Sequence, residues 1–288
     1  MTYSLITLSY NKLDCTRRCL TALITESVCD DQWEMIVVDN GSTDDSKEWC
    51  DNDLKALGAS HNIPVTVLHN STNIGCSAAR NQAIKAARGK YLIFADNDIA
   101  PRTSNWMTVM RSLLNSEPGI GMVGPKMVYA WKPHSIQCAG VGISKRGHVC
   151  FSGRGASIDT PAYNVKREVQ CLISACLMIP AELISRHGGF DKAFHPVQFE
   201  DFDLCYRLRE AGYTAVYTPD VEMYHFESVT TQGTPTVRNQ AVVIRNGLLF
   251  QKRWRHMFTS EDGPDEEACR WKQIPSVSFK DIVELPVY

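Results

Sequence analysis

The stretch YLIFADNDIAP, residues 91–101, joins a run of apolar residues to two aspartates. Its first five residues, 91–95, are almost entirely apolar, which is typical of a strand buried on both faces of a sheet. Asp96 and Asp98 follow directly, with one residue between them. Carboxylates in this position either shape a turn after the strand or hold a cation there.

The sequence before this stretch alternates between strand and helix patterns. Short apolar runs at residues 4–9, 33–38 and 64–68 predict three further strands. Residues 14–27 and 77–88 carry apolar or small residues at helical spacing. Strands that alternate with helices indicate β-α-β units, and therefore an α/β protein with a parallel sheet covered by helices.

Polar residues follow each of the four predicted strands. They occupy residues 10–11, 39–40, 70–73 and 96–98. Since ligands of such sheets bind beyond the carboxyl ends of the strands, this pattern predicts a polar site along one rim of the sheet. A further helix is predicted to begin at Ser42 or Thr43, because acidic residues follow there.

The second half of the chain is less regular. Strands are predicted at residues 122–128, 136–143, 169–179, 213–217 and 221–225, and helices at residues 199–211 and 240–258. Residues 145–163 contain several glycines and predict a flexible loop that could close over a ligand. Residues 259–288 have no pattern that predicts a fold.

Composition limits the function. The chain has 288 residues, 44% of them hydrophobic, and a formal net charge of -2, so no nucleic-acid partner is expected. Eleven cysteines without a CxxC pair favour reduced thiols and a cytoplasmic location. We expect neither a secretory leader nor a membrane span. Basic residues in the helix at 240–258 leave peripheral contact with the inner face of a membrane open.

Three groups of residues are candidates for chemistry. Asp96 and Asp98 offer hard oxygen ligands suited to Mg²⁺ or Mn²⁺, and His225 is a candidate third ligand. Gly75 precedes a helix start and Arg80 lies in its first turns, a combination that suits a phosphate group.

The third group is the acidic pair Glu200 and Asp201 at a predicted helix N-terminus. Acids are common there because the helix dipole favours them. Phe199 and Phe202 on either side indicate a partly buried setting, in which a carboxylate can accept a proton from a hydroxyl.

Six motifs in this order resemble the family 2 glycosyltransferases with the GT-A fold. They are SLITLSYN, IVVDNGSTDDS, NIGCSAARNQA, YLIFADNDIAP, GGFDKAFHPVQFEDFDLCYRLREAGY and YHFES. The resemblance covers residues 2–258 and implies a Rossmann-like, mostly parallel sheet flanked by helices, with a small antiparallel sheet on the acceptor side. It also implies one catalytic domain (1–258), divided into a nucleotide-sugar-binding half (1–98) and an acceptor and catalytic half (99–258), with residues 259–288 as an extension.

The resemblance assigns the donor-binding residues. Ser9 and Tyr10 correspond to residues that cradle the base of a nucleoside diphosphate sugar, and Asp39 to one that hydrogen-bonds the base. Gly75 and Arg80 correspond to the segment that lines the nucleotide and its diphosphate.

It also assigns the metal ligands and the acidic pair. Asp96, Asn97 and Asp98 correspond to the Asp-x-Asp segment, with Asp98 as the direct metal ligand, and His225 to a histidine that completes the site in some members. Asp201 corresponds to the general base and Glu200 to a residue that positions the acceptor.

The resulting expectation is a metal-dependent transfer of a sugar from a nucleoside diphosphate to an acceptor hydroxyl, with inversion. The Asp39 carboxylate suits the N3–H of a uracil or thymine, which favours UDP- or dTDP-sugars and leaves GDP open. Mn²⁺ or Mg²⁺ is the expected cofactor, and a carbohydrate or glycolipid the acceptor, in polysaccharide or glycoconjugate synthesis. The alternatives are a retaining enzyme of the same fold and an inactive nucleotide-sugar-binding relative.

Two other enzyme classes fit the sequence poorly. A dinucleotide-dependent oxidoreductase needs a GxGxxG loop after the first strand, and residues 9–12 read SYNK. A nucleotidyltransferase would carry a loop rich in glycine and arginine at the same place.

Overall fold

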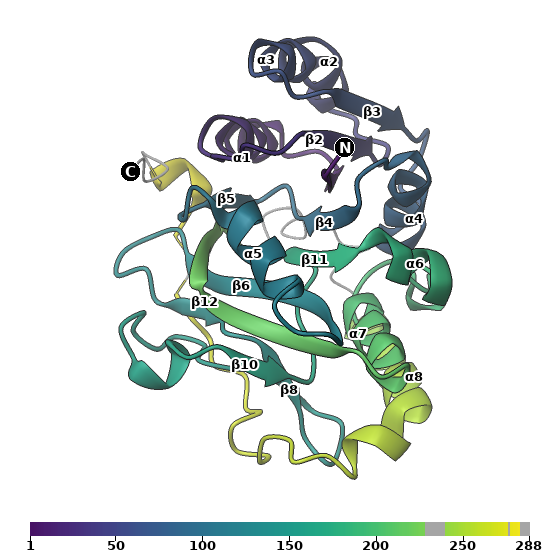
Figure 1. The fold of residues 1–288 in the computed structure, drawn as a ribbon, viewed down its shortest axis with the longest axis vertical. Helices are drawn as coiled ribbons and strands as arrows, with labels where there is room; N and C mark the ends of the chain where they lie inside the picture. Colours follow the sequence, from purple (N-terminus) through teal and green to yellow (C-terminus); the bar gives the residue numbers. More distant parts are fainter. Residues whose placement is uncertain (228–239, 276, 283–288) are drawn as a thin grey trace.

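The computed structural model describes residues 1–227, 240–275 and 277–282. A ten-stranded sheet runs through the molecule in the order β10-β12-β6-β11-β4-β1-β2-β3, with β5 paired to β12 and β7 to β6 (Figure 1). Its strands are β1 (Tyr3–Ser9), β2 (Trp33–Asp39), β3 (Val65–His69), β4 (Tyr91–Ala95), β5 (Ile99–Pro101), β6 (Ile120–Tyr129), β7 (Ile136–Cys138), β10 (Arg167–Val169), β11 (Cys176–Pro180) and β12 (Thr214–His225). A separate antiparallel pair is formed by β8 (Val141–Ile143) and β9 (Val149–Phe151).

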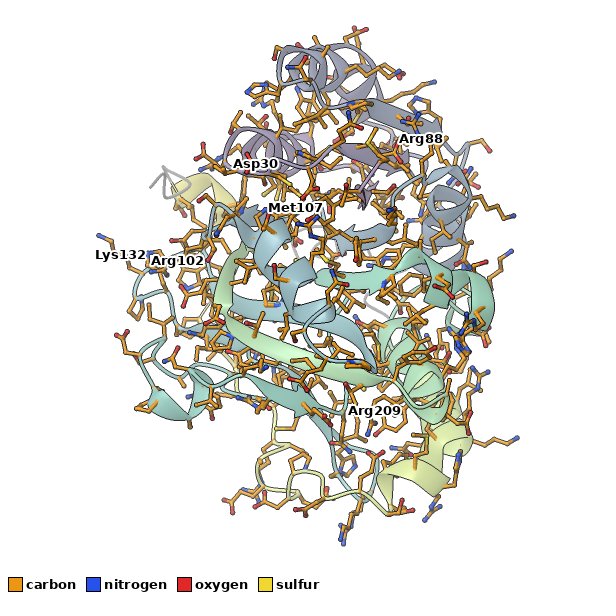
Figure 2. The ribbon with its side chains drawn as sticks, viewed as in Figure 1. Asp30, Arg88, Arg102, Met107, Lys132 and Arg209 are labelled. Atoms are coloured by element: carbon orange, nitrogen blue, oxygen red, sulfur yellow. The ribbon has the colours of Figure 1, made fainter. Side chains whose placement is uncertain are left out.

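Helices cover this sheet. The α-helices are α1 (Leu13–Thr25), α2 (Ser46–Trp49), α3 (Lys55–Ser60), α4 (Cys76–Ala86), α5 (Trp106–Leu114), α6 (Ala181–His187), α7 (Glu200–Glu210) and α8 (Gln240–Phe258). The short turns are the π-helical η1 (Cys50–Leu54) and the 3-10 turns η2 (Pro161–Tyr163), η3 (Lys192–Phe194) and η4 (Phe279–Asp281). Met107 of α5 is buried against the sheet, whereas Lys132 points away from the molecule (Figure 2).

The N-terminal half confirms the predicted parallel sheet. Strands β3, β2, β1 and β4 lie side by side and all run in the same direction. Strand β4 has the predicted bounds, and its neighbour on the other side, β11, is antiparallel. Because β4 lies between two strands and four of its five residues are buried, its apolar run forms part of the core, and the fold is α/β with a mostly parallel sheet.

Four strand predictions in the second half were wrong. The predicted strand at residues 136–143 is divided into β7 and β8, because Gly140 between them has a φ of 86° that β-structure does not accommodate. The predicted strand at residues 169–179 is divided into β10 and β11. Conversely, the two strands predicted at residues 213–217 and 221–225 are one strand, β12, with an irregularity between Thr218 and Glu222.

The helix predicted to begin at Ser42 or Thr43 begins later, at Ser46. Its expected first residues form a turn instead, in which the backbone N–H of Thr43 donates to Asn11 Oδ1 at 2.7 Å. In return, Asp44 Oδ2 accepts a hydrogen bond from the backbone N–H of Leu13. These contacts join the loops that follow β1 and β2, which are neighbouring strands.

Residues 145–163, predicted as a flexible loop, include β9 and η2. The described part of the C-terminal extension, residues 259–275 and 277–282, packs on the β8–β9 hairpin, where Pro264 lies against Gly142. It then returns to α1, where Arg18 Nη1 donates to the backbone oxygen of Ile282 at 2.8 Å (Figure 1).

Candidate active site

A cavity opens beside the carboxyl ends of β1, β2 and β4. It is lined by polar side chains from these strand ends, from α4 and α7, and from the end of β12. These residues are Tyr10, Asn40, Arg80, Asp96, Asn97, Asp98, Glu200, Asp201 and His225. The polar rim expected from the sequence is therefore present.

One part of the cavity holds a cluster of possible metal ligands. Single ligand atoms of Asp96, Asp98 and His225 all lie within 4.8 Å of one another. The pairing of β5 with β12 explains this proximity, since it places His225 opposite Ile99, the residue after Asp98. Two carboxylates and an imidazole are a donor set that suits a divalent cation such as Mn²⁺ or Mg²⁺.

The electrostatics of the cluster depend on its burial. Asp98 and His225 are 5% and 7% exposed, and His225 Nε2 lies 3.3 Å from Asp98 Oδ1. Burial lowers the pKa of His225, but the Asp98 carboxylate, together with Asp96 and Glu227, more than offsets this and raises the pKa to about 9. Asn97, between the two aspartates, donates a hydrogen bond to Thr16 Oγ1 on α1 at 2.7 Å and so fixes this part of the chain against the helix.

Arg80 connects this cluster to the acidic pair. Its guanidinium lies 3.0 Å from Asp96 Oδ1 through Nη2 and 3.0 Å from Glu200 Oε1 through Nη1. It is 6% exposed and its guanidinium carbon lies 5.1 Å from the centroid of the Phe190 ring. Arg80 is thus a fixed positive charge between two carboxylates at the cavity wall.

Glu200 and Asp201 begin α7. Asp201 Oδ2 accepts hydrogen bonds from the N–H and hydroxyl of Ser174, at 3.1 and 3.4 Å. Glu200 Oε2 is buried without a hydrogen-bond partner among the described residues. Burial raises the pKa of both carboxyls, and for Glu200 the neighbouring Asp201 raises it further, to about 7, against the opposing effect of Arg80.

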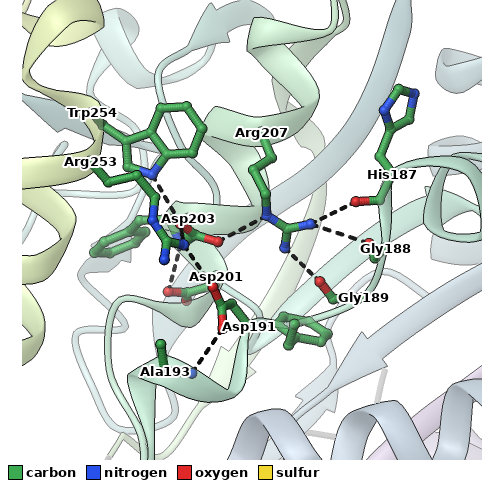
Figure 3. Close-up of polar contacts among 12 residues, drawn as sticks. His187, Gly188, Gly189, Asp191, Ala193, Asp201, Asp203, Arg207, Arg253 and Trp254 are labelled. Carbon is green, nitrogen blue, oxygen red and sulfur yellow. Dashed lines mark hydrogen bonds and ion pairs between the residues drawn. The ribbon is translucent and has the colours of Figure 1, made fainter.

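A buried ionic network holds α7 in place (Figure 3). Asp203, which is fully buried, accepts hydrogen bonds from Arg207 on the same helix and from Arg253 and Trp254 on α8, at 2.6–3.0 Å. Arg253 also lies 2.8 Å from Asp191. These contacts fix the helix that carries the acidic pair against its neighbours.

We expect Asp203→Ala to lower the free energy of unfolding by on the order of 3 kcal/mol, because it leaves two arginines and an indole N–H without their common acceptor. Chemical denaturation monitored by circular dichroism measures this. The control is Asp14→Ala, which removes an exposed ion pair with Arg17 and should change stability by less than about 1 kcal/mol. Equal effects of the two variants would contradict this role of Asp203.

Three predicted donor-binding residues do not line the cavity. Ser9 is fully buried, and the Asp39 carboxylate is 2–3% exposed, with one oxygen accepting from Ser42 N–H and the other 3.2 Å from His69 Nδ1. Gly75 has a φ of 82°, and a Cβ there would lie 2.5 Å from His195 Nδ1, so the glycine permits a close approach of two loops. Their chain neighbours Tyr10, Asn40 and Cys76 line the cavity instead.

Several lining residues were not predicted. They include Gln137, Phe151, Gln198, Glu227 and Trp271. Two of these residues lay within quoted motifs without being singled out: Gln198 in GGFDKAFHPVQFEDFDLCYRLREAGY and Glu227 in YHFES, whose last residue is outside the described residues. The other three come from the short strands β7 and β9 and from the extension, where no sequence pattern indicated a site.

The N-terminal part of the sequence matches a known protein family. A family model described as glycosyl transferase family 2 matches residues 4–137, which includes β1, β2 and β4 and the Asp-x-Asp segment. Residues 4–137 belong to glycosyl transferase family 2.

Two curated proteins are similar to this chain in sequence. The uncharacterized protein y4gI of Sinorhizobium fredii is 31% identical over 77% of this chain. The pre-mycofactocin glycosyltransferase of Mycobacterium tuberculosis is 28% identical over 66% of this chain. This chain spans only 24% and 37% of the lengths of these two relatives.

A solved structure shares the fold. The crystal structure of GalNAc-T7 with UDP, GalNAc and Mn²⁺ superimposes with a TM-score of 0.63 and 15% identity, over 78% of this chain and 44% of that one. This protein therefore has the GT-A fold. None of its helices, within the described residues, has the length and hydropathy of a membrane span.

Proposed function

We propose that this protein is a metal-dependent glycosyltransferase that moves a sugar from a nucleoside diphosphate to an acceptor hydroxyl with inversion. The observation that carries the proposal is one cavity that unites the Asp96, Asp98 and His225 cluster with Glu200 and Asp201. GalNAc-T7, which shares the fold, was crystallised with UDP, GalNAc and Mn²⁺.

The cluster fits a divalent cation, Mn²⁺ or Mg²⁺, and we assign Asp98, His225 and Asp96 to hold it. When bound, such an ion stabilises the negative charge that the departing nucleoside diphosphate acquires. Arg80 contributes a fixed positive charge at the same wall of the cavity and favours the same leaving group.

Asp201 has the properties of the general base. It lines the cavity, its side chain is oriented by Ser174, and burial raises its pKa toward the range in which a carboxylate accepts a proton efficiently. In the proposed reaction Asp201 takes the proton of the acceptor hydroxyl while Glu200 positions the acceptor. Attack from the face opposite the leaving group inverts the anomeric centre.

For the donor we propose a UDP- or dTDP-sugar. Tyr10 and Asn40 line the cavity at the ends of β1 and β2, and we assign the base of the nucleotide to this end of the cavity. Ser9, Asp39 and Gly75 act indirectly in this proposal: Ser9 is buried in β1, the Asp39 carboxylate holds the turn at Ser42, and Gly75 permits the close approach of the loop at His195. Residues 1–98 would form the donor half of the domain and residues 99–258 the acceptor half.

For the acceptor we propose a carbohydrate or glycolipid of a polysaccharide or glycoconjugate, handled in the cytoplasm at the inner face of the membrane. The exposed side chains of Ile244 and Leu248 on α8, both 61% exposed, together with basic residues of that helix, are compatible with contact to anionic lipid headgroups.

Thermal unfolding with UDP, dTDP, GDP, CDP and CMP, each with and without Mn²⁺, tests the donor site. We expect UDP or dTDP with Mn²⁺ to raise the melting temperature by several degrees, since a ligand at about 100 times its Kd stabilises the folded state by about 2.7 kcal/mol. CMP is the control that lacks a diphosphate. The absence of any shift with folded protein would contradict the proposed function.

A further inference from the structure

The cavity has an aromatic wall that the proposed reaction does not use. Trp271 of the C-terminal extension, Phe151 of β9 and Phe202 of α7 all line it. Trp271 is nevertheless 59% exposed, the most exposed large aromatic side chain in the described part of the chain. A large apolar side chain left open beside a polar cavity is typical of a ligand-contacting surface.

The indole of Trp271 is held in a fixed orientation. The guanidinium carbon of Arg154 lies 3.9 Å from its ring centroid, and the Phe151 ring meets it edge-on at 5.7 Å. Arg154 is itself fixed, since it makes two hydrogen bonds of 2.7 and 3.0 Å to the Glu227 carboxylate and a third to the backbone oxygen of Lys272. A preorganised ring loses little conformational freedom when a ligand packs on it.

The segment that carries Trp271 is anchored on the β8–β9 hairpin. Cys150 Sγ donates to the backbone oxygen of Ala268 at 3.2 Å, and His148 Nδ1 lies 2.5 Å from Glu266 Oε2. Trp271 is therefore part of the folded cavity wall.

Direct contacts connect Trp271 to the proposed reaction centre. Phe151 lies between Trp271 and Phe202, with a ring-centroid distance of 6.5 Å to Phe202, and Phe202 directly follows Asp201 in the chain. The aromatic wall is thus contiguous with the residue assigned as general base. Tyr10 and Asn40, which we assign to the nucleotide, come from the other half of the sheet.

A polar path also leads from Trp271 to the metal cluster. Beside Arg154, the Glu227 carboxylate accepts a hydrogen bond from Gln137 Nε2 at 3.0 Å, and Gln137 Oε1 lies 3.4 Å from His225 Nδ1. Glu227 and Gln137 line the same cavity as Trp271. An aromatic face beside carboxylate and amide groups suits a sugar ring, which has apolar C–H faces and a rim of hydroxyls.

We propose that Trp271 forms a stacking platform for a sugar ring of the acceptor. This assignment rests on the proposed function, in which the acceptor binds on the Asp201 side of the cavity, where Trp271 also lies. It also gives the C-terminal extension a binding role.

The test uses the full chain labelled with 5-fluorotryptophan, whose ¹⁹F resonances report each indole separately. Trp271→Phe assigns the resonance. The probes are the methyl glycosides of glucose, N-acetylglucosamine, mannose and rhamnose and the corresponding disaccharides, with and without UDP and Mn²⁺. We expect at least one of them to shift the Trp271 resonance, and Trp271→Ala to weaken its binding about tenfold while Trp271→Phe has a smaller effect.

The matched control is Trp131→Ala, which removes a tryptophan that packs on Tyr129 and does not line the cavity. It should leave saccharide binding unchanged. The platform is overturned if no saccharide shifts the Trp271 resonance, or if Trp271→Ala weakens UDP binding as much as saccharide binding, which would indicate a structural role.

The two proposals can fail separately in this experiment. Saccharide binding at Trp271 in a protein that binds no nucleotide would support the platform and contradict the transferase. Nucleotide binding without any response of Trp271 would contradict the platform alone.

Discussion

Asp201→Asn is expected to lower turnover by at least about 10²-fold while leaving Mn²⁺-dependent nucleotide binding intact, because it removes the proposed base and little else. The asparagine keeps the size of the side chain, and its carbonyl oxygen can still accept the hydrogen bond from the N–H of Ser174. The measurement is sugar transfer from the donor identified by thermal unfolding, followed as release of the nucleoside diphosphate.

Two further observations sharpen this prediction. Burial raises the pKa of Asp201, and the base acts only when it is deprotonated. The kcat/KM of the wild type should therefore rise with pH, and the midpoint of this rise should lie above the ordinary pKa of an aspartate. The control is Asp220→Asn, at the irregularity of β12 between Thr218 and Glu222 and outside the cavity lining, which should keep wild-type turnover. Near-normal turnover of Asp201→Asn would remove Asp201 from the base role.

Asp98→Ala is expected to abolish the Mn²⁺-dependent part of nucleotide binding and to lower turnover about 10³-fold, which corresponds to about 4 kcal/mol of lost charge stabilisation. Asp98 is the buried carboxylate of the cluster and lies beside His225. The measurements are the melting temperature with nucleotide and Mn²⁺, and direct Mn²⁺ binding by electron paramagnetic resonance.

Two variants make this result specific. Asp98→Asn keeps the shape of the side chain and removes its charge, so it should show the same loss if the charge holds the ion. Asp53→Ala, an exposed acid on η1, should bind Mn²⁺ and nucleotide as the wild type does. An unchanged Mn²⁺ response in Asp98→Ala would contradict a metal site at this cluster.

The N-terminal half of the fold was predictable because its strands are buried and its connections are short. The apolar run of β4 has the same bounds in sequence and structure, since both faces of the strand are covered. The second half was harder to predict because the local pattern of apolar residues does not indicate where the chain leaves the sheet. The run at residues 169–179 reads as one strand, but the chain leaves the sheet within it, and Ser174 donates to Asp201.

Some residues of the site were predictable from the sequence and others were not. Asp96, Asp98, Glu200 and Asp201 stood out because carboxylates are conspicuous after an apolar strand and at a helix start. Trp271 gave no such signal, because its partner Arg154 is more than a hundred residues away in the sequence, and only folding brings the two together.

The position of β4 also bears on how the chain can be assembled. The matched family segment, residues 4–137, contains β4 but not β11, which pairs with its second edge only after residue 175 has been added. During synthesis the strand YLIFA therefore presents an unpaired apolar edge while about eighty residues are still to come. The first half of this protein is a recognisable unit of sequence, but one edge of its strand β4 is covered only by a strand of the second half.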